Sequence, residues 1–189
     1  MKQEFSRLFY QDIYFEPVKE KNINLGWLSW VNNIKLIKYM SLEKKNFKYN
    51  DLKEYLNSHK SYAFLACYRK IDHAYIGNLR IYQLVPNVVS YGLIIDEKYH
   101  RLGYGTKFCK VALDLCFNWF NLDLVVAAAS KNNPAPTAYK TKLGFHKVDS
   151  CFLARWGLEK IINTSTSDGF YMDKKTFFNN QNLSINKAY

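Results

Sequence analysis

Long apolar runs are absent from this sequence. Its 189 residues contain no stretch of about 18 consecutive apolar residues, the length that a membrane-spanning helix needs. The N-terminal segment MKQEFSRLFYQD also lacks the continuous apolar block of a secretory signal peptide. We therefore predict a cytoplasmic protein with no membrane partner. A chain of this length suits one domain with a single core, and it shows no internal repeat and no linker.

Paired cysteines are absent as well. The four cysteines, Cys67, Cys109, Cys116 and Cys151, form no C-x-x-C pair and no spacing typical of metal ligands. Cys109 and Cys116 fall on one predicted helix, where small apolar thiols commonly pack. The sequence therefore predicts reduced, structural cysteines, no metal site and no disulfide framework.

Acidic residues are scarce relative to basic ones. The chain has 16 Asp and Glu against 27 Lys and Arg, which gives a formal net charge of +11. Such a charge favours acidic partners, for example nucleic acid or a nucleotide-bearing cofactor, although a biased composition alone would also explain it. The basic residues are not gathered into one Lys/Arg block, as they are in nucleic-acid-binding tails. Nucleic acid is therefore a disfavoured partner.

Hydrophobic periodicity predicts an alternation of strands and helices. Strands are expected over residues 12–18, 61–69, 74–84, 88–96 and 122–130, and two final strands over 151–156 and 169–175. Helices are expected over residues 24–40 (one or two helices), 49–60, 108–119 and 132–143.

These elements predict a single layered domain. The consecutive strands before residue 97 favour an antiparallel meander, and the strand, helix and strand over 88–130 favour a right-handed parallel crossover. We predict one domain over residues 1–178 and a flexible C-terminal tail over residues 179–189.

A loop with two glycines joins the strand at 88–96 to the next helix. The segment HRLGYGT places Gly103 and Gly105 at the helix start, directly after His100 and Arg101. A helix N-terminus carries unpaired N–H groups and a positive dipole end, and glycines let an anion approach the main chain closely. The third glycine of a dinucleotide fingerprint and the G-K-[ST] ending of a P-loop are both missing. The loop is therefore either another kind of phosphate site or a plain turn.

This loop and a second motif resemble those of the GCN5-related N-acetyltransferase superfamily. The family's fourth strand runs into a Q/R-x-x-G-x-G/A loop, and here HRLGYG takes that place with His100 at the usual Gln or Arg position. The segment NNPAPTAYKTKLGF resembles the second signature, an Asn, a short helix and a closing K-L-G-F. The resemblance covers about residues 12–172. It implies an α/β (α+β) fold with a mixed, mostly antiparallel sheet, flanked by helices and splayed between strands four and five.

The resemblance implies acetyl-CoA as the co-substrate. Its pyrophosphate is expected on the main-chain amides of the glycine loop, and its pantetheine arm in the splay beside the main chain of Leu93 and Ile95. Asn133 is expected to support the cofactor, to cap the following helix, or to do both. The cofactor-binding residues that the resemblance implies are Leu93, Ile95, His100, Arg101, Leu102, Gly103, Tyr104, Gly105, Thr106 and Asn133.

Catalytic residues match the family less directly. Many members use a tyrosine two residues before the Lys of K-L-G-F to protonate the departing thiolate. Gapless matching puts Lys140 there and Tyr139 one residue earlier, about 100° away around a helix. Irregular winding at the prolines would restore Tyr139 as the acid, and core packing is the alternative. Ser90 stands where a strand-four Glu is common, either to hold a water molecule or as an ordinary strand serine.

The resemblance implies an enzyme that acetylates a primary amine by direct transfer in a ternary complex. The segment around residues 24–40 resembles helices of bacterial enzymes for nucleotide-linked amino sugars and of ribosomal-protein N-terminal acetyltransferases. Trp27, Trp30 and Tyr39 are candidates to stack on a sugar or a base, or are core residues. We rank a nucleotide-linked amino sugar of surface polysaccharide biosynthesis first, a protein N-terminus second and another small amine such as a polyamine third. A non-catalytic acyl-CoA sensor is the alternative of another class, and a homodimer is left open.

Overall fold

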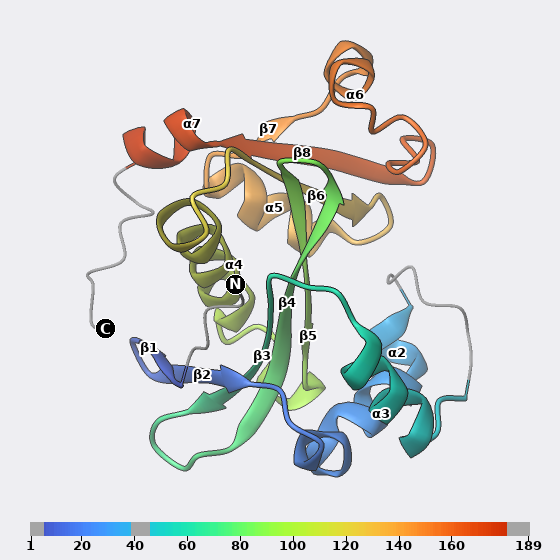
Figure 1. Ribbon diagram of the computed structural model, residues 1–189, viewed down its shortest axis with the longest axis vertical. Coiled ribbons are helices and arrows are strands. Elements are labelled where there is room, and N and C mark those ends of the chain that lie inside the picture. Colours follow the sequence, from blue (N-terminus) through green and yellow to red (C-terminus); the bar gives the residue numbers. More distant parts are fainter. Residues whose placement is uncertain (1–5, 39–45, 181–189) are drawn as a thin grey trace. The chain divides into compact units, whose positions relative to one another are not determined.

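The computed structural model describes residues 6–38 and 46–180 (Figure 1). Within them the strands form an eight-stranded sheet in the order β1-β2-β3-β4-β5-β6-β8-β7. The strands are β1 (Leu8–Tyr10), β2 (Ile13–Pro17), β3 (Ala63–Arg69), β4 (Tyr75–Val85), β5 (Val88–Ile95), β6 (Leu124–Ser130), β7 (His146–Lys147) and β8 (Ser167–Asp173). The sheet is mixed, because β5 and β6 run parallel whereas β1–β2, β2–β3, β3–β4, β6–β8 and β7–β8 are antiparallel. The predicted fold class is confirmed.

Helical segments connect these strands. They are η1 (Ile23–Trp27), α1 (Leu28–Asn32), α2 (Ile34–Ile37), α3 (Tyr49–Ser58), η2 (Glu97–Tyr99), α4 (Tyr104–Asp114), η3 (Leu115–Trp119), α5 (Pro134–Lys142), α6 (Ser150–Trp156) and α7 (Lys174–Asn179). In the described part of the chain, no helix has the length and apolar character that crossing a membrane requires.

The chain divides into two compact units. The first unit holds residues 6–38, 46–81 and 92–109 of the described chain, and the second holds residues 82–91 and 110–180. The glycine loop lies in the first unit, whereas Ser90, Asn133 and Tyr139 lie in the second.

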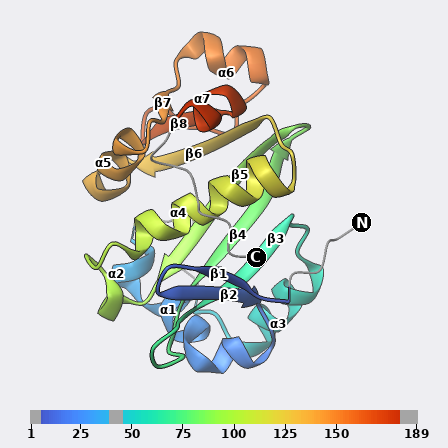
Figure 2. The same ribbon diagram turned by 90° about the vertical axis from the view of Figure 1, so that its left-hand side faces the viewer.

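The strands of the first unit are covered on both faces. The helices η1, α1 and α3 cover one face, and the first turns of α4 cover the other (Figures 1 and 2). On the α4 side the ring of Phe108 meets that of Phe15 edge-on, with 5.1 Å between centroids. On the other side the buried residues are Tyr14, Val18, Ile23, Trp27, Trp30, Val31, Leu52, Ala66, Tyr68 and Ile94.

Both tryptophans of the predicted N-terminal helices belong to this core. Trp27 and Trp30 are each only 5% exposed. The Trp27 ring contacts Phe64 at 5.2 Å, and the Trp30 ring contacts Tyr75 at 4.6 Å. The core alternative is therefore confirmed for these two residues, and Tyr39 lies outside the described residues.

The second unit is built around β6. This strand pairs with β8 along its whole length, from Leu124 opposite Asp173 to Ser130 opposite Ser167. The buried core on this sheet consists of Val88, Leu124, Val126, Leu153, Leu158 and Ile162. The buried strand that was predicted over residues 122–130 is confirmed.

One predicted strand is wrong. Residues 151–156 form the helix α6 and not a strand. The carboxylate of Asp149 accepts a hydrogen bond from the amide of Phe152 at 2.7 Å, which caps the helix, and Gly157 ends it with a left-handed φ of 63°. A short apolar run fits a helix and a strand equally well, and the cap and the glycine decide between them.

The ends of other elements also refine the prediction. The short strand β1 was not predicted, so the fourth and fifth strands of the prediction are β5 and β6. The last predicted strand stops at Asp173, whose side chain caps α7 by accepting from the amide of Thr176 at 2.7 Å. Helix α7 reaches Asn179, so the predicted tail begins at the end of this helix, and residues 181–189 lie outside the described residues.

Gly77 tests the packing between β4 and β5. A Cβ atom at this position would lie 2.4 Å from the main-chain oxygen of Ile94 and 3.1 Å from the ring of Phe108. Because a strand backbone cannot move aside cheaply, we expect Gly77→Ala to lower the free energy of unfolding by about 1–3 kcal/mol in urea denaturation. Gly105→Ala is the matched control, since an added Cβ there meets nothing within 4 Å. Equal stability of the Gly77→Ala and wild-type proteins would contradict the close contact.

Candidate active site

The parallel ladder between β5 and β6 is short. It joins Val88 to Leu124 and Val89 to Val125. Both strands continue, β5 as far as Ile95 in the first unit and β6 as far as Ser130 in the second. The predicted separation of their later parts stays a prediction. A strand edge that loses its neighbour presents main-chain donors and acceptors to an extended ligand.

Leu93 and Ile95 lie on the part of β5 beyond the ladder. The side chain of Leu93 is half-buried and that of Ile95 is buried, as expected for core residues. The carbonyl of Ile95 lies 2.9 Å from Nε2 of His100. Because a carbonyl only accepts, Nε2 carries the hydrogen and the imidazole ties the loop to the strand end. The structure thus gives His100 a main-chain partner, and its predicted contact with the pyrophosphate stays a prediction.

The glycine loop has a main chain shaped for an anion. Arg101 and Gly103 both adopt left-handed conformations, with φ of 63° and 81°. A residue other than glycine in this region costs about 1–2 kcal/mol, so the loop holds Arg101 in an unfavourable conformation. Left-handed residues beside right-handed ones turn successive N–H groups toward one concave surface, which binds anions.

Side chains leave this concave surface open. A Cβ atom added to Gly103 or to Gly105 would meet nothing within 4 Å, and the side chain of Leu102 is 59% exposed. The amide of Thr106 donates to the carbonyl of Gly103 at 3.1 Å, so within the helix it already has an acceptor. The earlier amides are the ones that a helix leaves without an intrahelical partner. The shape of the loop therefore fits a pyrophosphate on the amides before Thr106, and the residues that bind it stay a prediction.

An acidic side chain anchors the start of α4. Tyr104 is 7% exposed, and its hydroxyl donates a hydrogen bond to the carboxylate of Asp12, which lies in the turn between β1 and β2. The ammonium group of Lys107 forms an ion pair with the same carboxylate. The amide of Lys70 donates to the main-chain oxygen of Asp12 at 2.8 Å. Asp12 therefore fixes the first turn of the helix to the edge of the sheet.

Electrostatics keep this anchor in one protonation state. Partial burial raises the pKa of Asp12, but hydrogen bonds from Lys107, from the main chain and from Tyr104, together with the charge of Lys107, outweigh burial and leave the pKa lowered. Burial, followed by the charge of Asp12, raises the pKa of Tyr104. Near neutral pH the carboxylate is thus ionised and the phenol keeps its hydrogen.

Basic side chains lie beside the aromatic rings of the loop. The guanidinium of Arg69 is 5.7 Å from the ring centroid of Tyr99, and the ammonium of Lys107 is 4.9 Å from that of Tyr104. The two rings meet edge-on at 6.1 Å. Both cations are paired with carboxylates, Arg69 with Asp72 at 3.4 Å and Lys107 with Asp12, so they add little net charge beside the loop.

Asn133 begins α5 without capping it by its side chain. The residue occupies the N-cap position, yet its side chain makes no capping hydrogen bond. Its amide donates to the carbonyl of Ser130 at 2.9 Å. The side chain of Asn133 therefore does not cap the helix. The role of Asn133 in binding the cofactor stays a prediction.

Helix α5 turns Lys140 inward. Lys140 is only 3% exposed, and its ammonium group donates to the carbonyl of Ala128 on β6 at 3.1 Å and lies 5.5 Å from the ring centroid of Phe170. Tyr139, the preceding residue, is half-buried. In many family members a tyrosine occupies the position that corresponds to Lys140. In this chain the buried side chain at that position is the lysine. Ser90, which is 6% exposed, directly follows the last pair of the β5–β6 ladder.

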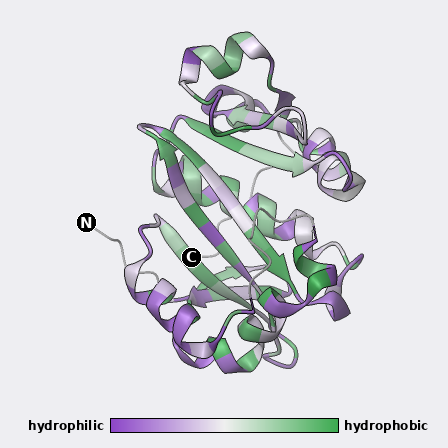
Figure 3. Cartoon of the chain, turned by 90° about the vertical axis from the view of Figure 1, so that its right-hand side faces the viewer, coloured by the Kyte–Doolittle hydropathy of each residue, from purple (hydrophilic) through white to green (hydrophobic). Residues whose placement is uncertain are grey.

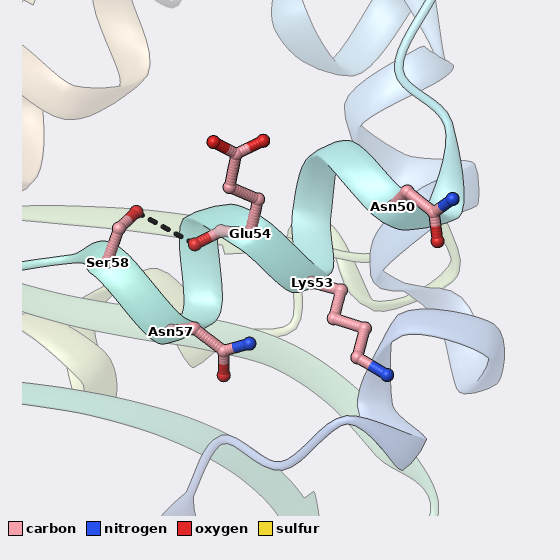
Figure 4. A pocket seen from close by; sticks show the side chains of 5 residues that line it. All are labelled: Asn50, Lys53, Glu54, Asn57 and Ser58. Carbon is pink, nitrogen blue, oxygen red and sulfur yellow. Dashed lines mark hydrogen bonds between the residues drawn. The ribbon is translucent and has the colours of Figure 1, made fainter.

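A separate hollow lies on the surface of α3 (Figure 4). It measures about 520 Å³ and is lined by Asn50, Lys53, Glu54, Asn57 and Ser58. All of these residues belong to one helix, and Ser58 donates to the carbonyl of Glu54 at 2.7 Å. None is a predicted site residue, so the hollow is not the site that the sequence indicates. In the described residues no three His, Cys, Asp or Glu side chains gather as for a metal ion, and the absence of a metal stays a prediction.

Sequence reasoning missed Asp12. The carboxylate and its partner Lys107 are 95 positions apart, and neither belongs to a motif. No local pattern gives such a pairing, which forms because α4 packs against β2 near the turn between β1 and β2.

The fold and the loop define a class of protein. A mixed sheet with one parallel strand pair, followed by a loop whose main chain is shaped for an anion at a helix N-terminus, suits a cofactor that has a phosphate group and an extended arm. A family model described as an acetyltransferase (GNAT) domain matches residues 13–146. The chain therefore belongs to the GNAT acetyltransferases, and it is an N-acetyltransferase that uses acetyl-CoA as the donor.

Solved structures show the same fold. A GNAT-family acetyltransferase from Bacillus anthracis is 14% identical with a TM-score of 0.70, and the match covers 89% of this chain and 99% of that one. A spermidine N-acetyltransferase from Vibrio cholerae, in complex with CoA and spermine, is 16% identical with a TM-score of 0.72, covering 88% and 98%. FdhC, a nucleotide-linked sugar GNAT, is 17% identical with a TM-score of 0.67, covering 95% and 96%. No curated protein matches the sequence.

Gly105→Ala tests the loop as a pyrophosphate site. The added methyl group meets no protein atom within 4 Å, so it projects into the space that we expect the anion to use. We expect the Kd for acetyl-CoA, measured by calorimetry, to rise about tenfold, with no loss of thermal stability in the absence of cofactor. Asn57→Ala on the exposed surface of α3 is the control. An unchanged Kd would show that the cofactor does not approach this amide.

Asp12→Asn tests the anchor. We expect the Kd for acetyl-CoA to rise about three- to tenfold, because the amide group loses the ion pair with Lys107. The pKa of Asp12 is lowered in the folded state, so its carboxylate stabilises the fold above its unfolded pKa of about 3.9. This contribution disappears as the pH falls through the folded pKa.

The matching measurement is thermal unfolding over a pH series. Below about pH 4 the wild-type melting temperature should fall more steeply than that of Asp12→Asn. Asp168→Asn serves as the control, since Asp168 forms a pair with Lys147 at 4.0 Å that is more than half exposed on the lysine side. Parallel pH curves for the wild type and Asp12→Asn would disprove the anchoring role.

Proposed function

We propose that the acceptor is the primary amine of a nucleotide-linked amino sugar used in surface polysaccharide biosynthesis. The net charge of +11 carries this proposal. An acceptor with a diphosphate group is attracted by such a charge, whereas a polycationic acceptor is repelled. The fold that the chain shares with FdhC, a nucleotide-linked sugar GNAT, supports the same choice.

The residues that we propose for cofactor binding come from both sides of the glycine loop. The main chain of residues 101–106 holds the pyrophosphate, with His100 beside it. The edge of β5 at Leu93 and Ile95 pairs with the pantetheine arm, and Asn133 supports it. A carbonyl has two lone pairs, so that of Ile95 accepts from His100 and still has one for the arm. The cofactor supplies the acetyl group as a thioester.

The proposed chemistry is direct transfer in a ternary complex. The acceptor amine must be neutral to attack, so its proton has to leave, and the departing sulfur has to gain one. We assign the second task to the hydroxyl of Tyr139. Ser90 holds a water molecule that relays the amine proton to solvent. Because no cysteine is paired with a histidine in the sequence motifs, no acyl-enzyme step is invoked.

Three alternatives have support of their own. A protein N-terminus remains the second candidate, because the N-terminal helices resemble those of ribosomal-protein acetyltransferases. A polyamine is supported by the fold shared with the spermidine N-acetyltransferase. A non-catalytic acyl-CoA sensor is the candidate of another class, since Ser90 replaces the common Glu and Lys140 takes the inward position on α5.

An acceptor panel tests the proposal. The purified chain would be given acetyl-CoA with UDP-glucosamine, dTDP-linked 3-amino and 4-amino dideoxyhexoses, a peptide with a free N-terminus, or spermidine, and thiol release would be followed. We expect the highest kcat/KM with a nucleotide-linked amino sugar. Tyr139→Phe should lower kcat with that acceptor by about a hundredfold and leave the KM for acetyl-CoA unchanged.

Calorimetry with acetyl-CoA separates the remaining outcomes. Saturating cofactor at 100 times its Kd should stabilise the fold by about 2.7 kcal/mol, which a thermal shift detects. Binding without turnover on any amine would support the sensor and contradict the proposed acceptor. If spermidine or the peptide is acetylated faster than the nucleotide-linked amino sugars, that amine is the acceptor and the proposed sugar is wrong.

A further inference from the structure

We propose that the side chains of Asn78 and Arg80 form an acceptor-recognition face on β4 that selects a substrate rich in oxygen and negative charge. This inference rests on the proposed function, because it places the acceptor on the side of the sheet that the N-terminal helices cover. Both residues belong to the first unit, and they are two positions apart on one strand. Side chains at this spacing point to the same face, roughly 7 Å apart.

Asn78 has a hydrogen-bond donor without a partner. The residue is only 3% exposed, and its Oδ1 accepts from the hydroxyl of Tyr75 at 2.6 Å. Burial raises the pKa of Tyr75 well above its ordinary value, so the phenol keeps a hydrogen that it can donate. With Oδ1 as the acceptor, the amide nitrogen is directed away from Tyr75. In the described part of the chain, Nδ2 of Asn78 is the buried side-chain atom that has no hydrogen-bond partner.

A buried side-chain amide without a hydrogen-bond partner is rare in folded proteins. Leaving a buried donor unsatisfied destabilises a protein by about 1–3 kcal/mol, whereas an apolar residue of the same shape carries no such penalty. Ala66 lies opposite Asn78 in the ladder and offers it no polar side chain. A ligand oxygen that accepts from Nδ2 would explain why an asparagine stands here. Because the nitrogen is covered by its neighbours, the acceptor meets it after a local shift of these neighbours.

Arg80 presents the second set of donors. Its Nε donates to the hydroxyl of Ser61 at 2.7 Å, and Nη1 donates to the hydroxyl of Tyr55 on α3. The guanidinium carbon also lies 5.1 Å from the centroid of the Tyr55 ring. Two neutral groups therefore orient a half-buried guanidinium, whose planar fork matches phosphate oxygens. Figure 3 shows hydrophilic segments within this otherwise hydrophobic central strand.

The chemistry of these two groups discriminates between the candidate acceptors. Amide nitrogen and guanidinium both donate hydrogen bonds and accept none. A sugar diphosphate offers hydroxyl and phosphate oxygens as acceptors, together with the opposite charge. A protonated polyamine offers only further N–H donors and the same charge, so it is repelled. The face therefore favours a sugar diphosphate over a polyamine.

The first test separates recognition from folding. Asn78→Leu alone would leave the hydroxyl of Tyr75 without its hydrogen-bond acceptor. The informative protein is therefore the double variant Tyr75→Phe/Asn78→Leu, which removes both polar groups. We expect it to be at least as stable as the wild type in urea. Its KM for UDP-glucosamine should rise about tenfold, with kcat and the KM for acetyl-CoA unchanged. Wild-type kinetics in this variant would overturn the role of Asn78.

The second test separates charge from geometry. Arg80→Lys keeps the charge and loses the fork, so kcat/KM should fall about tenfold for UDP-glucosamine and about twofold for free glucosamine. Asn78→Asp keeps the acceptor for Tyr75 and replaces the donor by a negative charge, so UDP-glucosamine should become worse and spermidine better. Asn57→Asp adds the same charge on the exposed surface of α3 and should change neither. Equal losses with both sugars, or no loss, would overturn the role of Arg80.

A failure of the proposed function can be distinguished from a failure of the recognition face. If the wild type acetylates no amine of the panel, binding of UDP-glucosamine to the acetyl-CoA complex is measured by calorimetry. Binding that Arg80→Lys weakens about tenfold supports the recognition face without an acetyl transfer to sugars. Binding that is absent or insensitive to both substitutions overturns it. If the wild-type protein prefers spermidine, the proposal of a recognition face is wrong, whereas the acetyltransferase activity stands.

Discussion

The tie between the end of β5 and the glycine loop is the interaction on which the rest of the site depends. Nε2 of His100 donates to the carbonyl of Ile95, the last residue of this strand. Such partners matter, because unpaired backbone polar groups are unfavourable away from water. The contact holds the loop at the strand end, beside the main chain that we propose for the pantetheine arm.

The glycine loop raises a second question, because an acidic residue lies beside a site for an anion. Asp12 would repel a pyrophosphate if its charge stood alone, but Lys107 and Tyr104 are bound to the same carboxylate. The paired charges largely cancel at a distance, whereas the contacts hold the first turn of α4 in place. Asp12 therefore adds rigidity at little electrostatic cost. Rigidity matters here, since the left-handed conformation of Arg101 is held against its own preference.

The local parts of this site could be predicted from the sequence, and the long-range parts could not. A β-branched run, two glycines and a helical apolar period are adjacent in the chain, so they indicated β5, the loop and α4. The pairing of Asp12 with Lys107 joins distant segments that no motif connects. The run at 151–156 suited either element, and the cap by Asp149 decided for a helix. The rotation that turns Lys140 and not Tyr139 toward β6 amounts to one residue, and the prolines at the start of α5 allow either winding in the sequence.

The proposed acceptor would require the site to hold two anions at once. Acetyl-CoA has a pyrophosphate, and the proposed acceptor has another, so the two substrates repel one another when they meet. A single block of basic residues would bind one of them and leave the other unscreened. Within the first unit, Arg80 lies on the face covered by the N-terminal helices, whereas Arg101 belongs to the glycine loop at the start of α4, the helix on the opposite face. A charge of +11 that is spread along the chain, and not gathered into one basic block, is compatible with the proposed division of roles.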